Sequence, residues 1–171
     1  MKLVLLAALA ASSVVIPASS RSDPINPIVI EGPARAGLVY WKQSVVRELD
    51  RNLAYPRSYP GWDMPEGTVA VQFICGEDGK PASVELSRSS GNRALDRAAL
   101  RAVERISTLH PLPAEISDGA ALRANVIFAT DHVSLARQEK GLRKEEAQLA
   151  ERERKDGRQV VVLETSLRTA G

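Results

Sequence analysis

The residues of this chain that could carry out acid–base, nucleophilic or metal chemistry are few and scattered. Its only two histidines, His110 and His132, lie far apart, and neither has the neighbouring cysteine or second histidine that a zinc site uses. The single cysteine, Cys75, alternates with apolar residues and is interpreted as a small buried side chain of a strand. We therefore predict no metal site and no cofactor.

Two short motifs resemble catalytic patterns only in part. Ser89-Ser90-Gly91 lacks the Gly-x-Ser-x-Gly arrangement of a nucleophile elbow. The sequence GEDG at 76–79 is followed by strand residues, so it predicts a hairpin turn and not a phosphate-binding loop. Asp96 falls in the first turn of an expected helix, where its charge suits the helix dipole. We expect no catalytic residues and no enzymatic activity.

A row of arginines at spacing four is the most distinctive charged feature. This spacing places them along one side of an expected helix whose other side is rich in alanine and should pack on a sheet. We interpret the row as a solvated face, and binding of an acidic partner such as an anionic envelope surface is the alternative. The net charge of +2 is too small to indicate a nucleic-acid partner. The row consists of Arg93, Arg97, Arg101 and Arg105.

Residues 1–20 have the pattern of a secretory signal peptide, with Lys2, an apolar run and small residues at its end. Cleavage after Ala18 and cleavage after Ser20 both fit this pattern, and export of the mature chain follows from either. The alternative is a retained membrane anchor, although the apolar run is shorter than the roughly 20 residues of a typical span. Residues 21–36 contain three prolines and are expected to form an extended lead-in.

Apolar periodicity predicts helix, strand, strand, helix and strand between residues 37 and 131. A stripe at spacing three to four predicts a helix that Tyr55-Pro56 ends. Alternating residues on both sides of the GEDGK turn predict a β-hairpin over 68–89. Asn92 is a suitable N-cap for the alanine-rich helix, and residues 121–130 alternate as a third strand.

These elements assemble most simply into a two-layer α+β domain. The hairpin and a right-handed crossover give a three-stranded antiparallel sheet of order 2-1-3, with both helices on one face. The outer side of the third strand is then an open edge, unless residues 159–165 or the lead-in pair with it.

Residues 132–171 form an extension of different composition. Leu135, Leu142 and Leu149 give a stripe that is too thin for a coiled coil, so we expect a solvated charged helix, with partner-dependent pairing as the alternative. Residues 159–165 are expected to form a late strand. It could pair with the open edge of the sheet or with a second copy, so a homodimer through this extension is one expected partner arrangement.

In their order along the chain, several short motifs over residues 38–130 resemble the C-terminal domain of TonB-type energy transducers. They include a Tyr-Pro pair, an alternating strand, a hairpin turn, a Ser-Ser-Gly loop, a Leu-Asp-x-Ala-Ala helix and two prolines before the last strand. The residues are Tyr55-Pro56, Gly67, Val69, Val71, Phe73, Asp78-Gly79, Val84, Ser89-Ser90-Gly91, Leu95-Asp96, Ala98-Ala99, Pro111 and Pro113.

The resemblance implies a periplasmic, non-enzymatic adaptor that is linked to energy transduction for transport. It implies a protein partner, an outer-membrane receptor peptide, which adds a strand to the open edge of the sheet. The alternative is a structural or self-assembling envelope protein with the same fold. On this basis the expected partner-binding residues are Arg123, Asn125, Ile127 and Ala129 of the third strand, joined by Tyr55 and Pro56.

Overall fold

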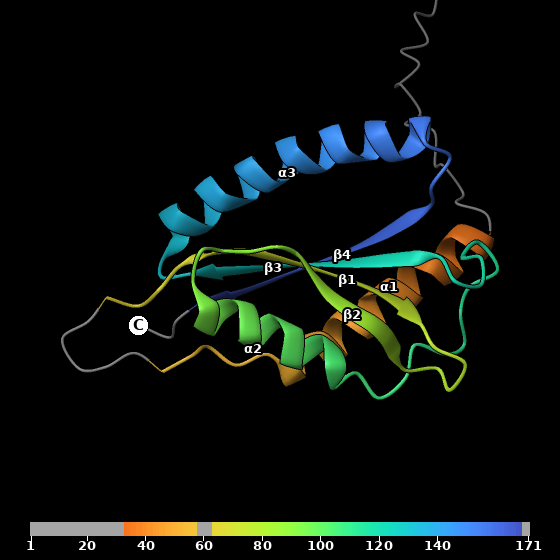
Figure 1. Cartoon of the computed structure of the whole chain (residues 1–171), viewed down its shortest axis with the longest axis horizontal. Coiled ribbons are helices and arrows are strands. Elements are labelled where there is room, and N and C mark those ends of the chain that lie inside the picture. Colours follow the sequence, from red (N-terminus) through yellow and green to blue (C-terminus); the bar gives the residue numbers. More distant parts are fainter. Residues whose placement is uncertain (1–32, 58–62, 169–171) are drawn as a thin grey trace, which may run out of the picture. The chain divides into compact units, whose positions relative to one another are not determined.

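The computed structural model describes residues 33–57 and 63–168, which belong to one compact unit. Helices α1 and α2 lie on one side of a sheet and α3 lies on the other (Figure 1). In chain order the elements are α1 (Pro33–Asn52), β1 (Gly67–Cys75), β2 (Pro81–Arg88), α2 (Arg93–Glu104), β3 (Ala121–Ala129), α3 (His132–Lys155) and β4 (Val160–Arg168).

Helix α1 buries the predicted apolar stripe, of which Val45 and Leu49 are almost inaccessible to solvent. The indole of Trp41 donates a hydrogen bond to the carbonyl oxygen of Leu109 (2.7 Å), which fixes α1 to the loop after α2. The helix begins at Pro33, inside the predicted extended lead-in. Proline is tolerated there because an amide in the first helical turn has no intrahelical partner.

The hairpin has the predicted form, with β1 antiparallel to β2. Val69, Val71 and Phe73 are buried on the side of α1 and α2. Gly79 in the turn has a φ of 77°, a conformation that glycine adopts at little cost. Its carbonyl oxygen accepts a hydrogen bond from the amide of Leu109 (2.6 Å), so the turn also docks against the loop after α2.

Helix α2 confirms both predictions made for it. The side chain of Asn92 caps the first turn by accepting hydrogen bonds from the amides of Ala94 and Leu95. The alanine-rich face is buried against the sheet, where small side chains permit a close approach.

The sheet has four strands in the order β2-β1-β3-β4. The predicted order of the first three strands is confirmed, but the predicted purely antiparallel, three-stranded sheet is wrong because β4 pairs with β3 in parallel. This pairing is the alternative in which the late strand covers the open edge. The physical reason is the length of α3: its 24 residues carry the chain back along the sheet, as a parallel connection requires.

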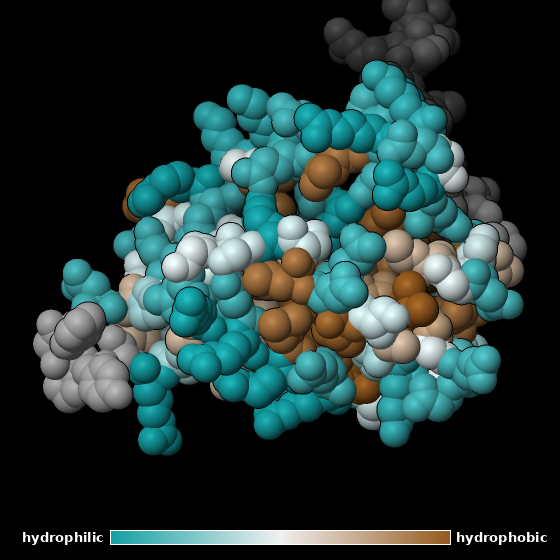
Figure 2. Space-filling model, in the orientation of Figure 1, coloured by the Kyte–Doolittle hydropathy of each residue, from teal (hydrophilic) through white to brown (hydrophobic). Residues whose placement is uncertain are grey.

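Helix α3 is not fully solvated, so that prediction is wrong, whereas pairing of α3 with a partner stays a prediction. It lies on the sheet face opposite α1 and α2, which makes the fold three-layered (Figure 1). Leu142 is buried there against Ile127 and Ala129, with Leu135 beside them. The outer side of α3 is hydrophilic, whereas hydrophobic residues gather near the middle of the same view, over β2 (Figure 2).

Candidate protein-binding surface

The four expected binding residues of β3 are buried and do not lie on an open edge. Arg123, Asn125, Ile127 and Ala129 point to the face that α3 covers, and each is at most 4% exposed. Strand β3 pairs with β1 on one side and with β4 on the other along almost its whole length. The prediction of an open β3 edge is therefore wrong for this conformation. The alternation in the sequence gives the two faces of a strand but does not say which segments lie beside it.

Tyr55 and Pro56 do not join those four residues. The Tyr55 hydroxyl donates a hydrogen bond to the carbonyl oxygen of Pro65 (2.6 Å). Its ring meets that of Phe128 edge to face, with 5.4 Å between centroids, on the opposite face of β3 from Arg123. Burial raises the pKa of the Tyr55 phenol, and the carboxylate of Glu66 adds to the effect. In this conformation Tyr55 anchors the chain after α1 to β3.

A buried ionic cluster attaches α3 to β3. The guanidinium of Arg123 donates to the carboxylate of Glu146 (3.1 Å) and also pairs with Glu153. The amide nitrogen of Asn125 donates to the other oxygen of Glu146 (3.0 Å). Two atoms of this cluster, Arg123 Nε and Asn125 Oδ1, are buried without a hydrogen-bond partner. Because removing charges from water costs free energy, such an interface holds α3 less firmly than an apolar one of the same size would.

Strand β4 is held beside β3 at its start, middle and end. The side-chain amide of Gln159, just before the strand, donates to the carbonyl oxygen of Glu115 (2.7 Å). The Thr165 hydroxyl is hydrogen-bonded to Asp50 of α1. The guanidinium of Arg168 contacts the ring of His132 at the start of α3. Val161 and Leu163 add the buried apolar contacts of the strand.

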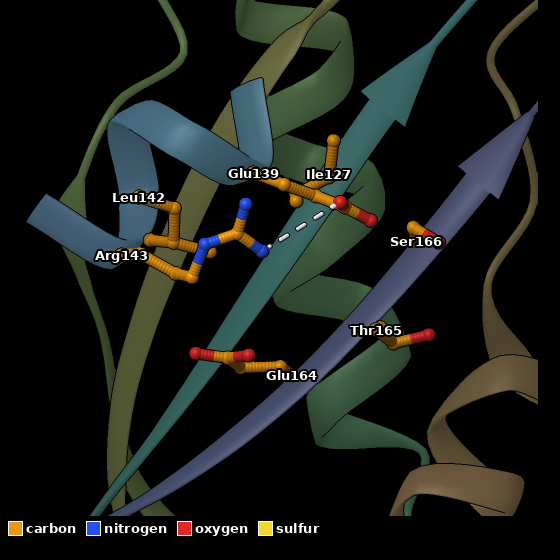
Figure 3. A pocket seen from close by; sticks show the side chains of 7 residues that line it. All are labelled: Ile127, Glu139, Leu142, Arg143, Glu164, Thr165 and Ser166. Atoms are coloured by element: carbon orange, nitrogen blue, oxygen red, sulfur yellow. Dashed lines mark ion pairs between the residues drawn. The ribbon is translucent and has the colours of Figure 1, made fainter. Parts of the chain in front are cut away.

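A groove of about 210 Å³ lies between α3 and β4. Figure 3 shows its floor, formed by β3 and β4, and the ion pair between Arg143 and Glu139 (3.8 Å) on α3 above it. The groove indicates that α3 does not seal against β4. Its lining is mixed, with Ile127, Glu139, Leu142, Arg143, Glu164, Thr165 and Ser166.

Asp96 has a structural role that the sequence analysis described only in part. Its carboxylate accepts hydrogen bonds from the Ser89 hydroxyl (2.6 Å), the Ser90 amide (2.9 Å) and the Ser90 hydroxyl (2.8 Å). Burial opposes ionisation of this carboxyl, but the hydrogen bonds outweigh it and hold its pKa below the ordinary value. Asp96 thus closes the Ser-Ser-Gly loop onto α2.

The predicted arginine row is exposed on α2. Arg93, Arg97, Arg101 and Arg105 all face solvent, and none forms an ion pair with another residue that the structure describes. Like charges at spacing four oppose helix formation by about 0.2–0.5 kcal/mol a pair. The row therefore does not stabilise α2.

The described residues contain no group of three or more His, Cys, Asp or Glu side chains that could hold a metal ion. Burial raises the pKa of the Cys75 thiol, with Asp78 and Asp118 adding to the effect, which disfavours the reactive thiolate. Among the helices of 33–57 and 63–168, none is long and apolar enough to cross a membrane.

Comparison with known families gives one match. Residues 62–129 match the family model described as Gram-negative bacterial TonB protein C-terminal, which confirms the resemblance seen in the motifs. The match covers β1, β2, α2 and β3 and ends before α3 and β4. Comparisons with curated proteins and with solved structures find no match.

Proposed function

Because residues 62–129 match the TonB C-terminal family model, we propose that this chain is a periplasmic, non-enzymatic binding module for an envelope protein. Its partner is an extended segment of an outer-membrane receptor, added as a strand to the sheet. The binding is linked to energy transduction for transport.

The observation that carries this proposal is the parallel pairing of β4 with β3. The edge of β3 lies inside the family-matched segment, whereas β4 comes from the extension outside it. This edge accepts an extended strand over nine residues, mainly through its backbone. Backbone pairing requires few special side chains and is a common mode of peptide recognition. In this proposal β4 is an internal occupant of the edge, and a partner strand competes with it.

Several features of β4 support its exchange for a partner strand. Only Val161 and Leu163 of the strand are buried, and Glu164, Ser166 and Arg168 are exposed. The polar attachments at Gln159, Thr165 and Arg168 exchange readily for contacts with water, because exposed polar contacts contribute little net free energy. The groove between α3 and β4 also favours the exchange, because α3 does not enclose β4 on that face of the sheet.

A reversible covalent tether tests the competition directly. Ala129 and Arg168 are in register across β3 and β4, so an A129C/R168C variant in a C75A background can form a disulfide that retains β4. The reduced variant is expected to bind a receptor-derived extended peptide, and the oxidised variant is not.

The matched control is I74C/A82C, which joins β1 to β2 and leaves β4 free. It should bind the peptide equally well when oxidised and when reduced. Equal binding by both forms of A129C/R168C would contradict the competition at β3. A proline at Ile127 should abolish binding, and peptide binding that survives it would count against strand addition to β3.

Self-assembly is the alternative function, and one observation favours it. Strand β4 lies at one edge of the sheet, and no other strand of the described residues pairs with its outer side. A second copy could pair there, which would make the chain a structural envelope protein. Size measurement of the chain with and without residues 132–171 separates the two proposals, since a dimer that disappears on truncation favours self-assembly.

Export through a signal peptide at residues 1–20, followed by the lead-in at 21–36, remains part of the proposal. Residues 1–32 lie outside the described residues. The mass of the chain isolated from the cell envelope would distinguish a cleaved signal from a retained inner-membrane anchor.

A further inference from the structure

We propose that the outer faces of α1 and α2 form a docking surface for an anionic phospholipid membrane. This basic surface is distinct from the β3 edge, and its function does not depend on strand binding. It consists of Arg47, Arg51, Arg93, Arg97, Arg101 and Arg105.

The arginines of α2 form the longer part of the basic surface. All four are exposed, on the side of the helix opposite the buried alanine face. From Arg93 to Arg105 the row extends along the axis by roughly 18 Å, at 1.5 Å a residue. Asp96, the acidic residue of the first turn, is buried and engaged by the serines before α2. It therefore does not neutralise the row.

Helix α1 continues this surface. Tyr40, Arg47 and Arg51 recur at spacing seven and four, which places them on one exposed side of the helix. The two helices pack together on the same face of the sheet (Figure 1). The carboxylate of Glu48 joins them by accepting from the amide (2.6 Å) and hydroxyl (2.5 Å) of Ser107. This acid is thereby engaged at the junction.

Most arginines of α3 differ from those of the basic surface, because they are paired with glutamates, although Arg152 is exposed and forms no ion pair with a described residue. On α3, Arg143 pairs with Glu139, and both Arg154 and Lys155 pair with Glu151. The arginines of the basic surface form no ion pair with the residues that the structure describes. Their charge is therefore complementary to an anion outside the chain.

A lipid surface fits this arrangement better than an acidic peptide does. The arginines are spread over two neighbouring helices, and guanidinium groups bind phosphate through paired hydrogen bonds. Tyr40 is 70% exposed beside them. Tyrosine is enriched where lipid headgroups meet water, because its ring is apolar and its hydroxyl is polar. An array of anionic headgroups can meet all these side chains at once.

The test is co-sedimentation of the full chain with vesicles of phosphatidylglycerol and phosphatidylcholine, compared with vesicles of phosphatidylcholine alone. The apolar N-terminal segment should contribute equally to binding of both kinds of vesicle. The ratio of the two affinities therefore removes its contribution. R97E/R101E is expected to lower binding to the anionic vesicles by about tenfold or more. Salt at about 0.5 M should weaken the wild-type binding because it screens the charges.

The matched control is K140E/K144E, which makes the same change in charge at the same spacing on exposed positions of α3. It should bind anionic vesicles at least threefold more tightly than R97E/R101E does. Equal losses in the two variants would overturn the proposed surface, as would equal wild-type binding to both kinds of vesicle. Binding to poly-glutamate without binding to anionic vesicles would overturn the lipid assignment in favour of an acidic protein. Circular dichroism of each variant verifies that the fold is retained.

Discussion

At the scale of single residues, the most informative polar side chains are structural. Asp96 resembles a catalytic carboxylate in its burial and lowered pKa, yet all its contacts fix the loop before α2. Arg123 resembles a binding residue by its position on β3, yet it is paired with the glutamates of α3. Both residues stabilise the sheet that a partner would meet.

The substitution D96N is expected to lower the free energy of unfolding by about 1–3 kcal/mol, because it weakens a buried, charge-assisted set of hydrogen bonds. The folded pKa lies below the unfolded value of about 3.9. The contribution of Asp96 is therefore complete at neutral pH and is lost as the pH falls through the folded pKa. Urea unfolding at a series of pH values should show wild type and D96N converging in acid.

E104Q is the control for this prediction, since Glu104 is exposed on the same helix. It should change stability by less than about 0.5 kcal/mol. A constant difference between wild type and D96N down to strongly acidic pH would contradict the role of the ionised carboxylate.

The substitution R123M is expected to lower the free energy of unfolding by about 3 kcal/mol, because it leaves Glu146 and Glu153 without their buried partner. Adding E146Q and E153Q should restore a large part of this loss, because neutral amides need no counter-charge. R143M is the comparison, since Arg143 is 69% exposed and its ion pair should contribute less than about 1 kcal/mol. Similar losses for R123M and R143M in chemical unfolding would contradict a buried cluster.

At the scale of elements, the sequence predicted what depends on local pattern. The Asn92 cap, the alanine face of α2 and the alternation of β1 each depend on a few adjacent residues, and each is confirmed. The place of α3 was not predictable from its leucines alone. Leu142, Glu146, Leu149 and Glu153 recur at spacing four, three and four, so glutamates complete the docking face. Apolar periodicity alone does not predict that a helix packs on the sheet when part of its contact with the sheet consists of ion pairs.

The sequence predicts a late strand at residues 159–165 but does not decide which strand pairs with it. The partner depends on the direction in which α3 leads the chain. The four β3 residues were assigned to a binding face because alternation placed them away from the core, and nothing local indicated that α3 covers them.

If the β3 edge accepts strands, it should accept β4 when β4 is supplied as a separate peptide. A chain that ends at Gly157 is expected to bind a synthetic peptide of residues 159–168, measured by fluorescence anisotropy. The same peptide with Leu163→Pro should bind at least tenfold more weakly, because proline disturbs strand pairing and the buried leucine is lost. Failure of the unmodified peptide to bind a folded truncated chain would show that β4 needs its covalent connection.

At the scale of the whole molecule, the chain combines a segment that matches the TonB C-terminal family model with an extension that adds a strand to its sheet. The matched segment ends with β3, and the extension places β4 in parallel along the outer side of β3. Helices α1 and α2, which carry the exposed arginines, lie on the side of the sheet away from α3 (Figure 1). Membrane docking on that side and strand exchange at β3 can therefore be tested independently.

Hydrogen exchange of the full chain, with and without a bound receptor-derived peptide, tests the central claim most directly. In the free chain the amides of β3 and the inward-directed amides of β4 should be protected. When the peptide binds, β3 should stay protected and β4 should exchange as an unpaired segment. Peptide binding with β4 still fully protected would contradict the account, because the partner would then lie somewhere other than the edge that β4 occupies.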